Sequence, residues 1–413
     1  MDLDPARAIA DLRELAARTG GPDGARRVCW TPEWEVAREF LRERLASLGG
    51  AAEVSVDAAG NLWAVVPGST EDTVVLGSHV DSVPAGGWLD GALGVMAALE
   101  VLRGVAAAGS PPPRTVALVD WVDEEGARFG RSLLGSSAFA GSLDVEAVRG
   151  LRDADGVALD DALREHGVEL EQMPSAGDRR LESLCAYLEL HIEQGPVLEE
   201  EGQPCAAVAG CVGVERHRVT FSGRAAHAGT TPMDRRADAG VAAARVILGL
   251  PEIAERHGGV CTAGRLDMEP GIATAVPGRA GLLVDQRHLD SEELAAMLAE
   301  AAALWDSAGA SENCSVRAER IWSIEPVPFH PGLVALAASA CADAGGRAEP
   351  LPSGALHDAA ELARVVPAAM VFSSSVGGVS HSPAEDTPEA DLERALEAYG
   401  ALASRVIEEG VPS

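Results

Sequence analysis

Residues 74–83 read VVLGSHVDSV, an apolar run of strand length that leads directly into a histidine and an aspartate. The same arrangement, an apolar run and then polar residues, recurs in TVALVDWVDEE at 115–125, YLELHIEQG at 187–195, and AAMVF at 368–372 followed by SHSP at 380–383. Alanine-rich stretches with helical character lie between these runs. Strands that alternate with helices predict an α/β fold, with a mixed central sheet and flanking helices.

The middle of the chain has a different pattern. Its apolar periodicity predicts a strand at 212–221, a helix at 237–250, strands at 261–268 and 280–287, a helix at 291–307 and a strand at 314–322. This β-α-β-β-α-β order is typical of a ferredoxin-like unit. We therefore expect a discontinuous metal-binding catalytic domain formed by 1–210 and 326–413, with a separate domain inserted at 211–325.

Charge and composition exclude several classes of function. The chain has 413 residues, 47% of them hydrophobic, and a formal net charge of −31. Such an acidic surface repels nucleic-acid backbones and anionic lipid. The first twenty residues favour an amphipathic helix over a secretory signal, and no apolar run has the length of a membrane span. The seven scattered cysteines contain no C-x-x-C pair, which favours a reduced, cytoplasmic setting.

Histidines and carboxylates gather where the predicted strands end. They are His79, Asp81, Asp90, Glu124, Glu125, His191 and His381. In an open α/β sheet, ligands bind at the carboxyl ends of the strands, so these residues are expected to converge. Each also has a simpler interpretation: Asp90 as a helix cap, the glutamate pair as a solvated charge pair, and any one histidine as a structural residue.

Taken together, these residue types favour metal chemistry. Imidazole and carboxylate suit zinc, and also manganese, cobalt or nickel. One carboxylate can bridge two ions that share a water and polarise a carbonyl. Of two adjacent glutamates, one can ligate a metal while the other moves a proton. Spacing alone thus predicts a metal hydrolase.

Several segments resemble the M20-type metal-dependent amidohydrolases, in the group of N-carbamoyl-L-amino-acid hydrolases, β-ureidopropionases and allantoate amidohydrolases. The matching segments are GSHVDSV at 77–83, GGWLDG at 86–91, DEEGARF at 123–129, ELHIEQGP at 189–196, AHAGTTPM at 226–233, DQR at 285–287 and GGVSHSPAE at 377–385. They cover nearly the whole chain in order. HIEQGP and AHAGTTPM are specific to this group.

The resemblance implies a role for each matching residue of the metal site. His79, Asp90 and His191 would hold one divalent ion, and Asp90, Glu125 and His381 the other, with Asp90 bridging. Asp81 would orient His79 from behind. Glu124 would be the general base that takes a proton from the attacking water and passes it to the leaving nitrogen.

The inserted domain resembles the lid and dimerisation domain of the same group. His227 would stabilise the oxyanion, often in the partner subunit's site, and Arg287 would grip the substrate carboxylate. The alternatives are a turn-capping histidine and a strand-end salt bridge. Gln194, Arg216, Thr274 and His357 fall at positions that line the substrate pocket in this group.

The implied reaction is hydrolysis of a non-peptide C–N bond in an N-carbamoyl or ureido acid, which releases ammonia, carbon dioxide and the amine. A deacylase or peptidase acting on an N-acyl amino acid is the alternative enzyme. A metal-free binding protein is the alternative outside catalysis, although all the expected ligands are present. The resemblance also implies a homodimer joined through the inserted domain.

Three positions depart from the group's pattern, all on the substrate side. Thr274 stands where asparagine is usual, Ala226 where a polar residue is frequent, and Leu356 where glycine is usual. Losing an asparagine amide removes both a donor and an acceptor, while leucine adds bulk. We hypothesise a substrate that is bulkier or less polar around the ureido group than those of familiar members. Neutral drift is the alternative.

Overall fold

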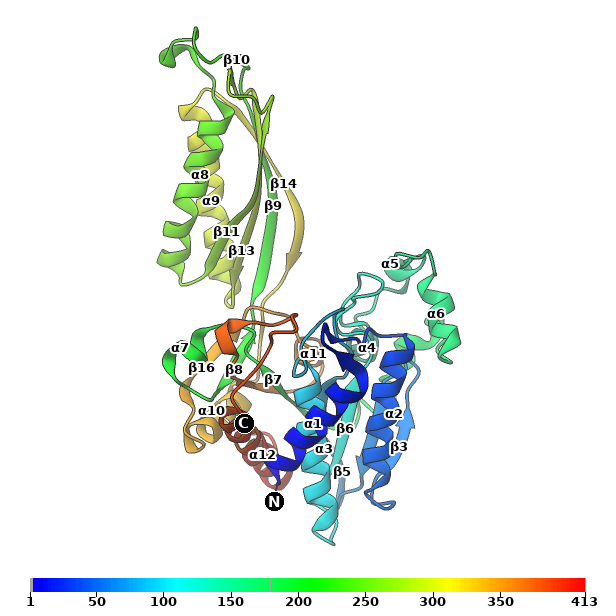
Figure 1. Cartoon of the computed structure of the whole chain (residues 1–413). Coiled ribbons are helices and arrows are strands. Elements are labelled where there is room, and N and C mark those ends of the chain that lie inside the picture. The colour runs from blue at the N-terminus through cyan, green and yellow to red at the C-terminus, as the bar shows by residue number, and fades with distance from the viewer. Residues whose placement is uncertain (1–2, 179, 413) are drawn as a thin grey trace. The chain divides into compact units, whose positions relative to one another are not determined.

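The computed structural model describes residues 3–178 and 180–412 (Figure 1). The chain divides into two compact units, which we call the large unit and the inserted unit. The large unit contains the chain up to Gly210 and from Phe329 onward, and the inserted unit spans Cys211–Pro328. Met1 and Asp2 of the expected N-terminal helical segment lie outside the described residues.

A mixed sheet forms the centre of the large unit. Within the described residues of this unit its strand order is β8-β17-β7-β5-β6-β4-β3, with β16 also paired to β8. These strands are β3 Glu53–Val56, β4 Leu62–Val66, β5 Thr70–His79, β6 Arg114–Trp121, β7 Leu184–Ile192, β8 Cys205–Cys211, β16 Arg347–Ser353 and β17 Ala368–Ser373. The neighbours β6, β5, β7 and β17 are parallel, so their carboxyl ends meet at one edge.

Helices cover the buried, apolar strands of this sheet. Helix α3 (Ala92–Ala107) packs on β5, β6 and β7, and α12 (Glu389–Glu409) on β7 and β17. Helix α1 (Pro5–Thr19) packs on α3 and α12, and the Asp4 side chain caps its first turn. The remaining helices are α2 Pro32–Ala46, α4 Leu134–Ala140, α5 Val145–Val148, α6 Leu159–Glu165, α7 Val197–Glu201, α10 Pro331–Asp343 and α11 Asp358–Leu362.

The inserted unit is a four-stranded antiparallel sheet with two helices on one face (Figure 1). Its elements follow the order β9 Gly213–Ser222, α8 Ala239–His257, β11 Val260–Glu269, β13 Arg279–His288, α9 Ser291–Ser311 and β14 Ser315–Ile324. A short pair, β10 Ala226–His227 and β12 Ala275–Val276, lies beside them. Alternate residues such as Val219, Phe221 and Leu282 bury against α8 and α9, and their neighbours face outward.

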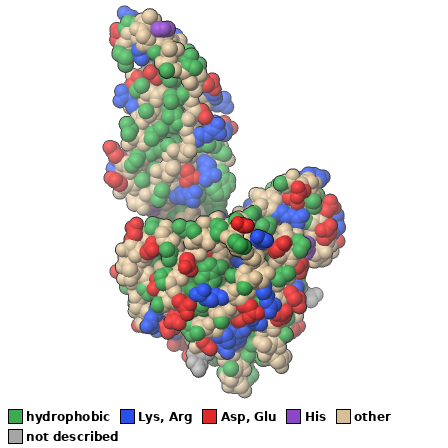
Figure 2. Space-filling model, viewed as in Figure 1, with side chains coloured by type: hydrophobic (Ala, Val, Ile, Leu, Met, Phe, Trp, Pro, Cys, Tyr) green, Lys and Arg blue, Asp and Glu red, His purple; other side chains and the backbone are tan. Residues whose placement is uncertain are grey.

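The fold class predicted from the sequence is confirmed: an α/β layer with a mixed sheet, and a separate antiparallel domain. The sequence predicted a mixed sheet but did not locate its antiparallel strands β3, β4 and β8 at the sides of the parallel core. None of the helices among the described residues combines the length and apolarity needed to cross a membrane. On the face seen in Figure 2, acidic and basic side chains are interspersed rather than gathered into one patch.

Candidate metal centre

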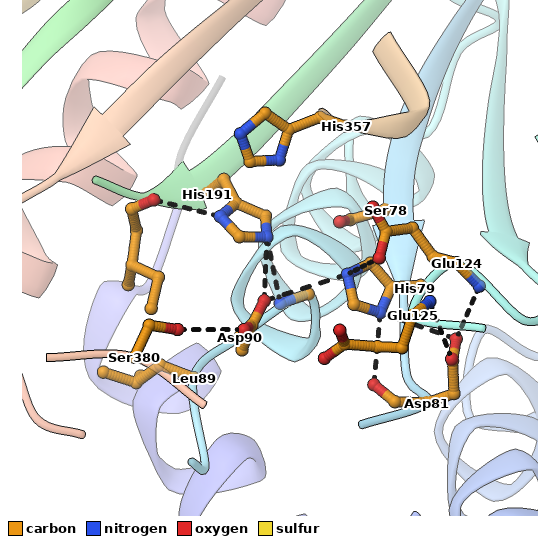
Figure 3. A network of polar contacts seen from close by, with 12 residues as sticks. Ser78, His79, Asp81, Leu89, Asp90, Glu124, Glu125, His191, His357 and Ser380 are labelled. Carbon is orange, nitrogen blue, oxygen red and sulfur yellow. Dashed lines mark hydrogen bonds and ion pairs between the residues drawn. The ribbon is translucent and has the colours of Figure 1, made fainter. Parts of the chain in front are cut away.

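Polar residues at the ends of the parallel strands, and in the loops that follow them, meet at the carboxyl edge of the sheet (Figure 3). His79 ends β5 and His191 lies near the end of β7, while Glu124 and Glu125 follow β6. His381 lies in the loop after β17. Because parallel strands end on the same side of a sheet, residues up to 302 positions apart come together there.

The rings of His79 and His191 are oriented by main-chain carbonyl groups. Nδ1 of His79 lies 3.1 Å from the carbonyl oxygen of Asp81, and Nδ1 of His191 lies 3.0 Å from that of Ile192. A carbonyl oxygen only accepts, so each Nδ1 carries the proton and donates. In the neutral rings, Nε2 then presents a lone pair on the opposite side, which is the form that ligates metals.

Asp90 lies between the two Nε2 atoms and a third histidine. Its Oδ1 is 3.1 Å from Nε2 of His191 and 3.9 Å from Nε2 of His79. Its Oδ2 is 3.1 Å from Nε2 of His381. Burial alone would raise the pKa of Asp90, but the neighbouring rings of His191 and His381 outweigh it and hold the pKa well below its usual value. The carboxylate is therefore ionised and shared between two clusters.

Two groups of ligand atoms can each hold a metal ion. In the first, His79, Asp90 and His191 place their ligand atoms within 4.8 Å of one another, and in the second Asp90, Glu125 and His381 do the same. Nε2 of His381 is 3.4 Å from Oε2 of Glu125. The first group is buried, whereas half of the His381 side chain is exposed.

Glu124 is buried beside the first group. It is 8% exposed, and its Oε2 lies 3.6 Å from Nε2 of His79. This burial does not fit the alternative of a solvated charge pair with Glu125. Burial raises the pKa of Glu124 well above its usual value, with His79 opposing and Asp358 adding to the effect. A carboxyl group with a raised pKa is suited to take and return a proton near neutral pH.

Asp81 holds the glutamate pair through the main chain. Its Oδ1 accepts a hydrogen bond from the Glu124 N–H at 3.3 Å, and its Oδ2 from the Glu125 N–H at 3.2 Å. Its Oδ1 lies 3.5 Å from Nδ1 of His79, farther than its own main-chain oxygen. Asp81 thus links the β5 loop to the β6 loop.

Three residues in or next to the two ligand groups have left-handed backbone conformations that favour glycine. They are Asp123 with φ 55°, Gln194 with φ 57° and His381 with φ 53°. Such a conformation costs a non-glycine residue about 1–3 kcal/mol, and it persists only where the surrounding structure holds it. The three residues lie on separate loops of one site. This indicates that the surrounding structure holds each loop in the conformation that places its side chain in the site.

Gln194 and His357 lie close to the metal ligands. Nε2 of Gln194 donates to Oδ2 of Asp90 at 3.0 Å and to Oγ of Ser380 at 3.0 Å. The His357 ring is buried, with its centroid 4.4 Å from that of His191, and its Nε2 is 2.9 Å from Oγ of Ser353. Gln194 thus contacts one proposed ligand and His357 packs against another, and the predicted place of both residues in the substrate pocket stays a prediction.

The other expected site residues belong to the inserted unit. His227 is exposed, and its Nδ1 accepts hydrogen bonds from the N–H groups of Gly229 and Thr230. The proton of the neutral ring is therefore on Nε2, which can donate to an oxyanion. Thr274 lies next to this segment, where its carbonyl accepts from the N–H of Ala228.

Arg216 and Arg287 share one carboxylate on the outward face of the inserted sheet. Oδ2 of Asp285 accepts from Nε and Nη2 of Arg216 at 2.9 and 2.6 Å. Its Oδ1 accepts from Nε of Arg287 at 2.8 Å. The salt bridge that the sequence raised as an alternative for Arg287 is thus present, and it joins two guanidinium groups in one cluster.

Some polar residues of the site were not predicted from the sequence. Ser380 and Glu385 bind the loop of Asp90, and the buried Glu189 accepts from Ser78 Oγ at 2.7 Å and the Ala359 N–H at 3.0 Å. Ser380 and Glu385 both lie within the GGVSHSPAE segment, the only sequence signal for them. Their partners lie far away in the sequence, so the contacts emerge only from the fold.

Comparison with known proteins gives consistent results along the chain. Residues 75–405 match the family model described as peptidase family M20/M25/M40. The chain is 38% identical to an N-carbamoyl-L-amino acid amidohydrolase of Geobacillus stearothermophilus, with 93% of each chain covered. It is 34% identical to an allantoate amidohydrolase of Bacillus subtilis, with 95% of each covered.

Solved structures agree with these relatives. A hydantoinase/carbamoylase family amidase from Burkholderia multivorans matches with a TM-score of 0.89 and 34% identity, covering 98% of both chains. The structure of AtUAH in complex with glyoxylate matches with a TM-score of 0.71 and 27% identity, again covering 98% of both.

Proposed function

Because the chain belongs to the M20 family of amidohydrolases, in the carbamoylase and allantoate amidohydrolase group, we propose that it hydrolyses an N-carbamoyl or ureido amino acid. The products are ammonia, carbon dioxide and the amine. The observation that carries this proposal is the pair of ligand groups that share Asp90, with the buried Glu124 beside them.

The residues present fit two divalent ions. Two buried histidines have their Nδ1 protons held by carbonyl groups, and one ionised carboxylate presents an oxygen to each cluster. His79 and His191 would hold one ion and Glu125 and His381 the other, with Asp90 bridging. When bound, such ions polarise the substrate carbonyl and lower the pKa of a water. Nitrogen and oxygen ligands suit zinc, manganese, cobalt or nickel.

Glu124 moves the proton in this scheme. Its carboxylate accepts a proton from the attacking water, and the carboxyl group then donates it to the nitrogen that leaves the ureido carbon. The hydrogen bonds from the Glu124 and Glu125 main chain to Asp81 keep the base in place while its charge changes. Burial excludes bulk water that would otherwise exchange this proton.

The inserted unit supplies the residues that recognise the substrate. Nε2 of His227 would donate to the carbonyl oxygen as negative charge develops on it. Arg287, supported by Asp285 and Arg216, would bind the substrate carboxylate. Glyoxylate, bound in the AtUAH structure, is also a small carboxylate. Thr274 and Leu356 would widen the preference toward bulkier or less polar groups.

We further propose that the inserted unit is the lid and joins two chains into a homodimer. Helix α8 exposes the apolar side chains of Val241, in its first turn, and Leu248, near its middle, at 38% and 76%, and a second chain would cover them. Sedimentation at micromolar concentration tests this. A dimer that becomes monomeric in Leu248→Glu supports it, and a monomeric wild-type protein overturns it.

A substrate panel tests the reaction itself. Ammonia and amine are measured for N-carbamoyl amino acids of increasing side-chain size, allantoate, ureidoglycolate and N-acyl amino acids. Equal ammonia and amine from a carbamoyl or ureido compound support the proposal. Amine without ammonia, from an acyl compound, would show a deacylase instead. If the variants Thr274→Asn and Leu356→Gly hydrolyse small carbamoyl substrates faster than the wild-type protein does, these two residues contribute to substrate specificity.

A further inference from the structure

Glu385 lies directly behind the ligand that both metal groups share. It is 2% exposed, so it makes its contacts inside the protein. Its Oε1 accepts hydrogen bonds from the N–H groups of Leu89 and Asp90 at 2.9 and 3.0 Å. Its Oε2 is 3.0 Å from Oγ of Ser380. One carboxylate therefore joins the loop before α3 to the loop after β17.

Ser380 extends this connection to the ligand carboxylate itself. Its Oγ lies 3.0 Å from Oδ2 of Asp90, the oxygen that faces His381. Gln194, in the loop after β7, donates from its Nε2 both to Oδ2 of Asp90 and to Oγ of Ser380. Three loops that follow different strands are thus tied together around one side of Asp90.

The local sequence is adapted to the position of the Glu385 carboxylate. A Cβ atom on Gly87 would lie 2.0 Å from the carboxyl carbon, so only glycine leaves room for it there. Arg27 is fully buried, and this burial lowers the pKa of its guanidinium group, while the charge of Glu385 is the foremost of those that oppose the shift. An arginine counter-charge reduces the cost of burying the carboxylate.

The ligand next to this network needs external support. His381 follows Ser380 directly, half of its side chain is exposed, and its φ of 53° is unfavourable for a non-glycine residue. Its ring lies against Asp90 and Glu125, the other members of its own ligand group. By contrast, His79 and His191 lie in or at the end of buried strands and have their rings fixed by carbonyl groups.

We infer that Glu385 is a positioning residue that fixes Asp90 and His381 relative to each other, so that the second ligand group is formed before a metal ion arrives. The inference rests on the ligand assignment proposed above. Glu385 itself touches neither substrate nor metal in this scheme. Removing a carboxylate that orients a metal ligand typically weakens metal binding by about 10–100-fold.

Cobalt binding to the full-length protein tests the inference. Metal-stripped wild type, Glu385→Gln and Ser380→Ala are titrated with Co²⁺ by calorimetry and visible absorption. Glu389→Gln is the matched control. Glu389 follows Glu385 closely in the sequence, but it is exposed and pairs with Arg13 at the surface. We expect about 10–100-fold weaker binding of the second Co²⁺ in Glu385→Gln, an altered absorption band for that ion, and a smaller effect in Ser380→Ala.

Gly87→Ala provides an independent variant that keeps the carboxylate and only displaces it. It should reproduce the weaker second site. Wild-type Co²⁺ affinities and spectra in all three variants, even with lower melting temperatures, would overturn the inference and leave Glu385 a structural residue. A wild-type protein that binds no Co²⁺ would instead overturn the ligand assignment, and this inference with it.

Discussion

At the scale of single residues, Glu124 and Glu125 show how position separates two identical side chains. Both follow β6, yet Glu125 lies against His381 while Glu124 faces His79. Replacing Glu124 by glutamine keeps its size but removes the group that accepts a proton. We expect kcat to fall by about 10²–10⁴-fold. Metal content, measured on the same sample, should stay at the wild-type value; a matching loss of metal would make Glu124 a ligand.

Metal binding to the second group should depend on pH. Hydrogen bonding to Asp90 raises the pKa of His381 to about 9, and burial raises the pKa of Glu125 to about 7. Both groups bind metal only when deprotonated, so protons must leave as the ion enters. Affinity for the second ion should therefore increase as pH rises from about 6 toward 9 and level off above that. Calorimetry in buffers of different ionisation enthalpy counts the released protons, and a constant affinity across this range would contradict these assignments.

At the scale of elements, the centre depends on how closely α3 approaches the strands that carry the ligands. A Cβ atom on Gly94 would lie 2.4 Å from the Leu190 carbonyl oxygen and 2.6 Å from Ser78 Cβ. Gly94→Ala should therefore push α3 away from β5 and β7 and destabilise the fold by about 1–3 kcal/mol.

Chemical denaturation of the metal-stripped protein measures this effect. Gly281→Ala is the control, because a Cβ atom there meets open space. Equal stability of both variants would show that the helix adjusts without cost.

Most elements could be predicted from the sequence, because their apolar periodicity is strong. The helix predicted at 237–250 is present as α8, and the strand at 280–287 as β13. The short antiparallel strands could not be predicted, since β3 has only four residues and is largely exposed. Among site residues, strand-end position and motif predicted the residues of the two candidate ligand groups, which the structure brings together. The contacts of Gln194 and Glu385 could not be inferred, because hydrogen bonds between distant loops leave no periodic signal.

At the scale of the whole molecule, metal binding and substrate recognition are assigned to different units. Arg287 lies on the inserted sheet, whereas every proposed ligand lies in the large unit. Arg287→Met should therefore leave the binding of two ions unchanged and raise KM. A hydrogen bond to a charged group contributes about 1.5–3 kcal/mol, so we expect kcat/KM to fall by about 10–10²-fold. Steady-state kinetics beside metal analysis measures both, and a loss of metal in this variant would contradict the separation.

The most direct test of the account joins metal stoichiometry to the reaction product. Metal-stripped protein is titrated with Zn²⁺ or Mn²⁺, and bound metal and ammonia from an N-carbamoyl amino acid are measured on the same samples. We expect no ammonia without metal, and ammonia release that rises until two ions are bound per chain. Ammonia release from the stripped protein, or two bound ions with no ammonia from any carbamoyl or ureido compound, would contradict it.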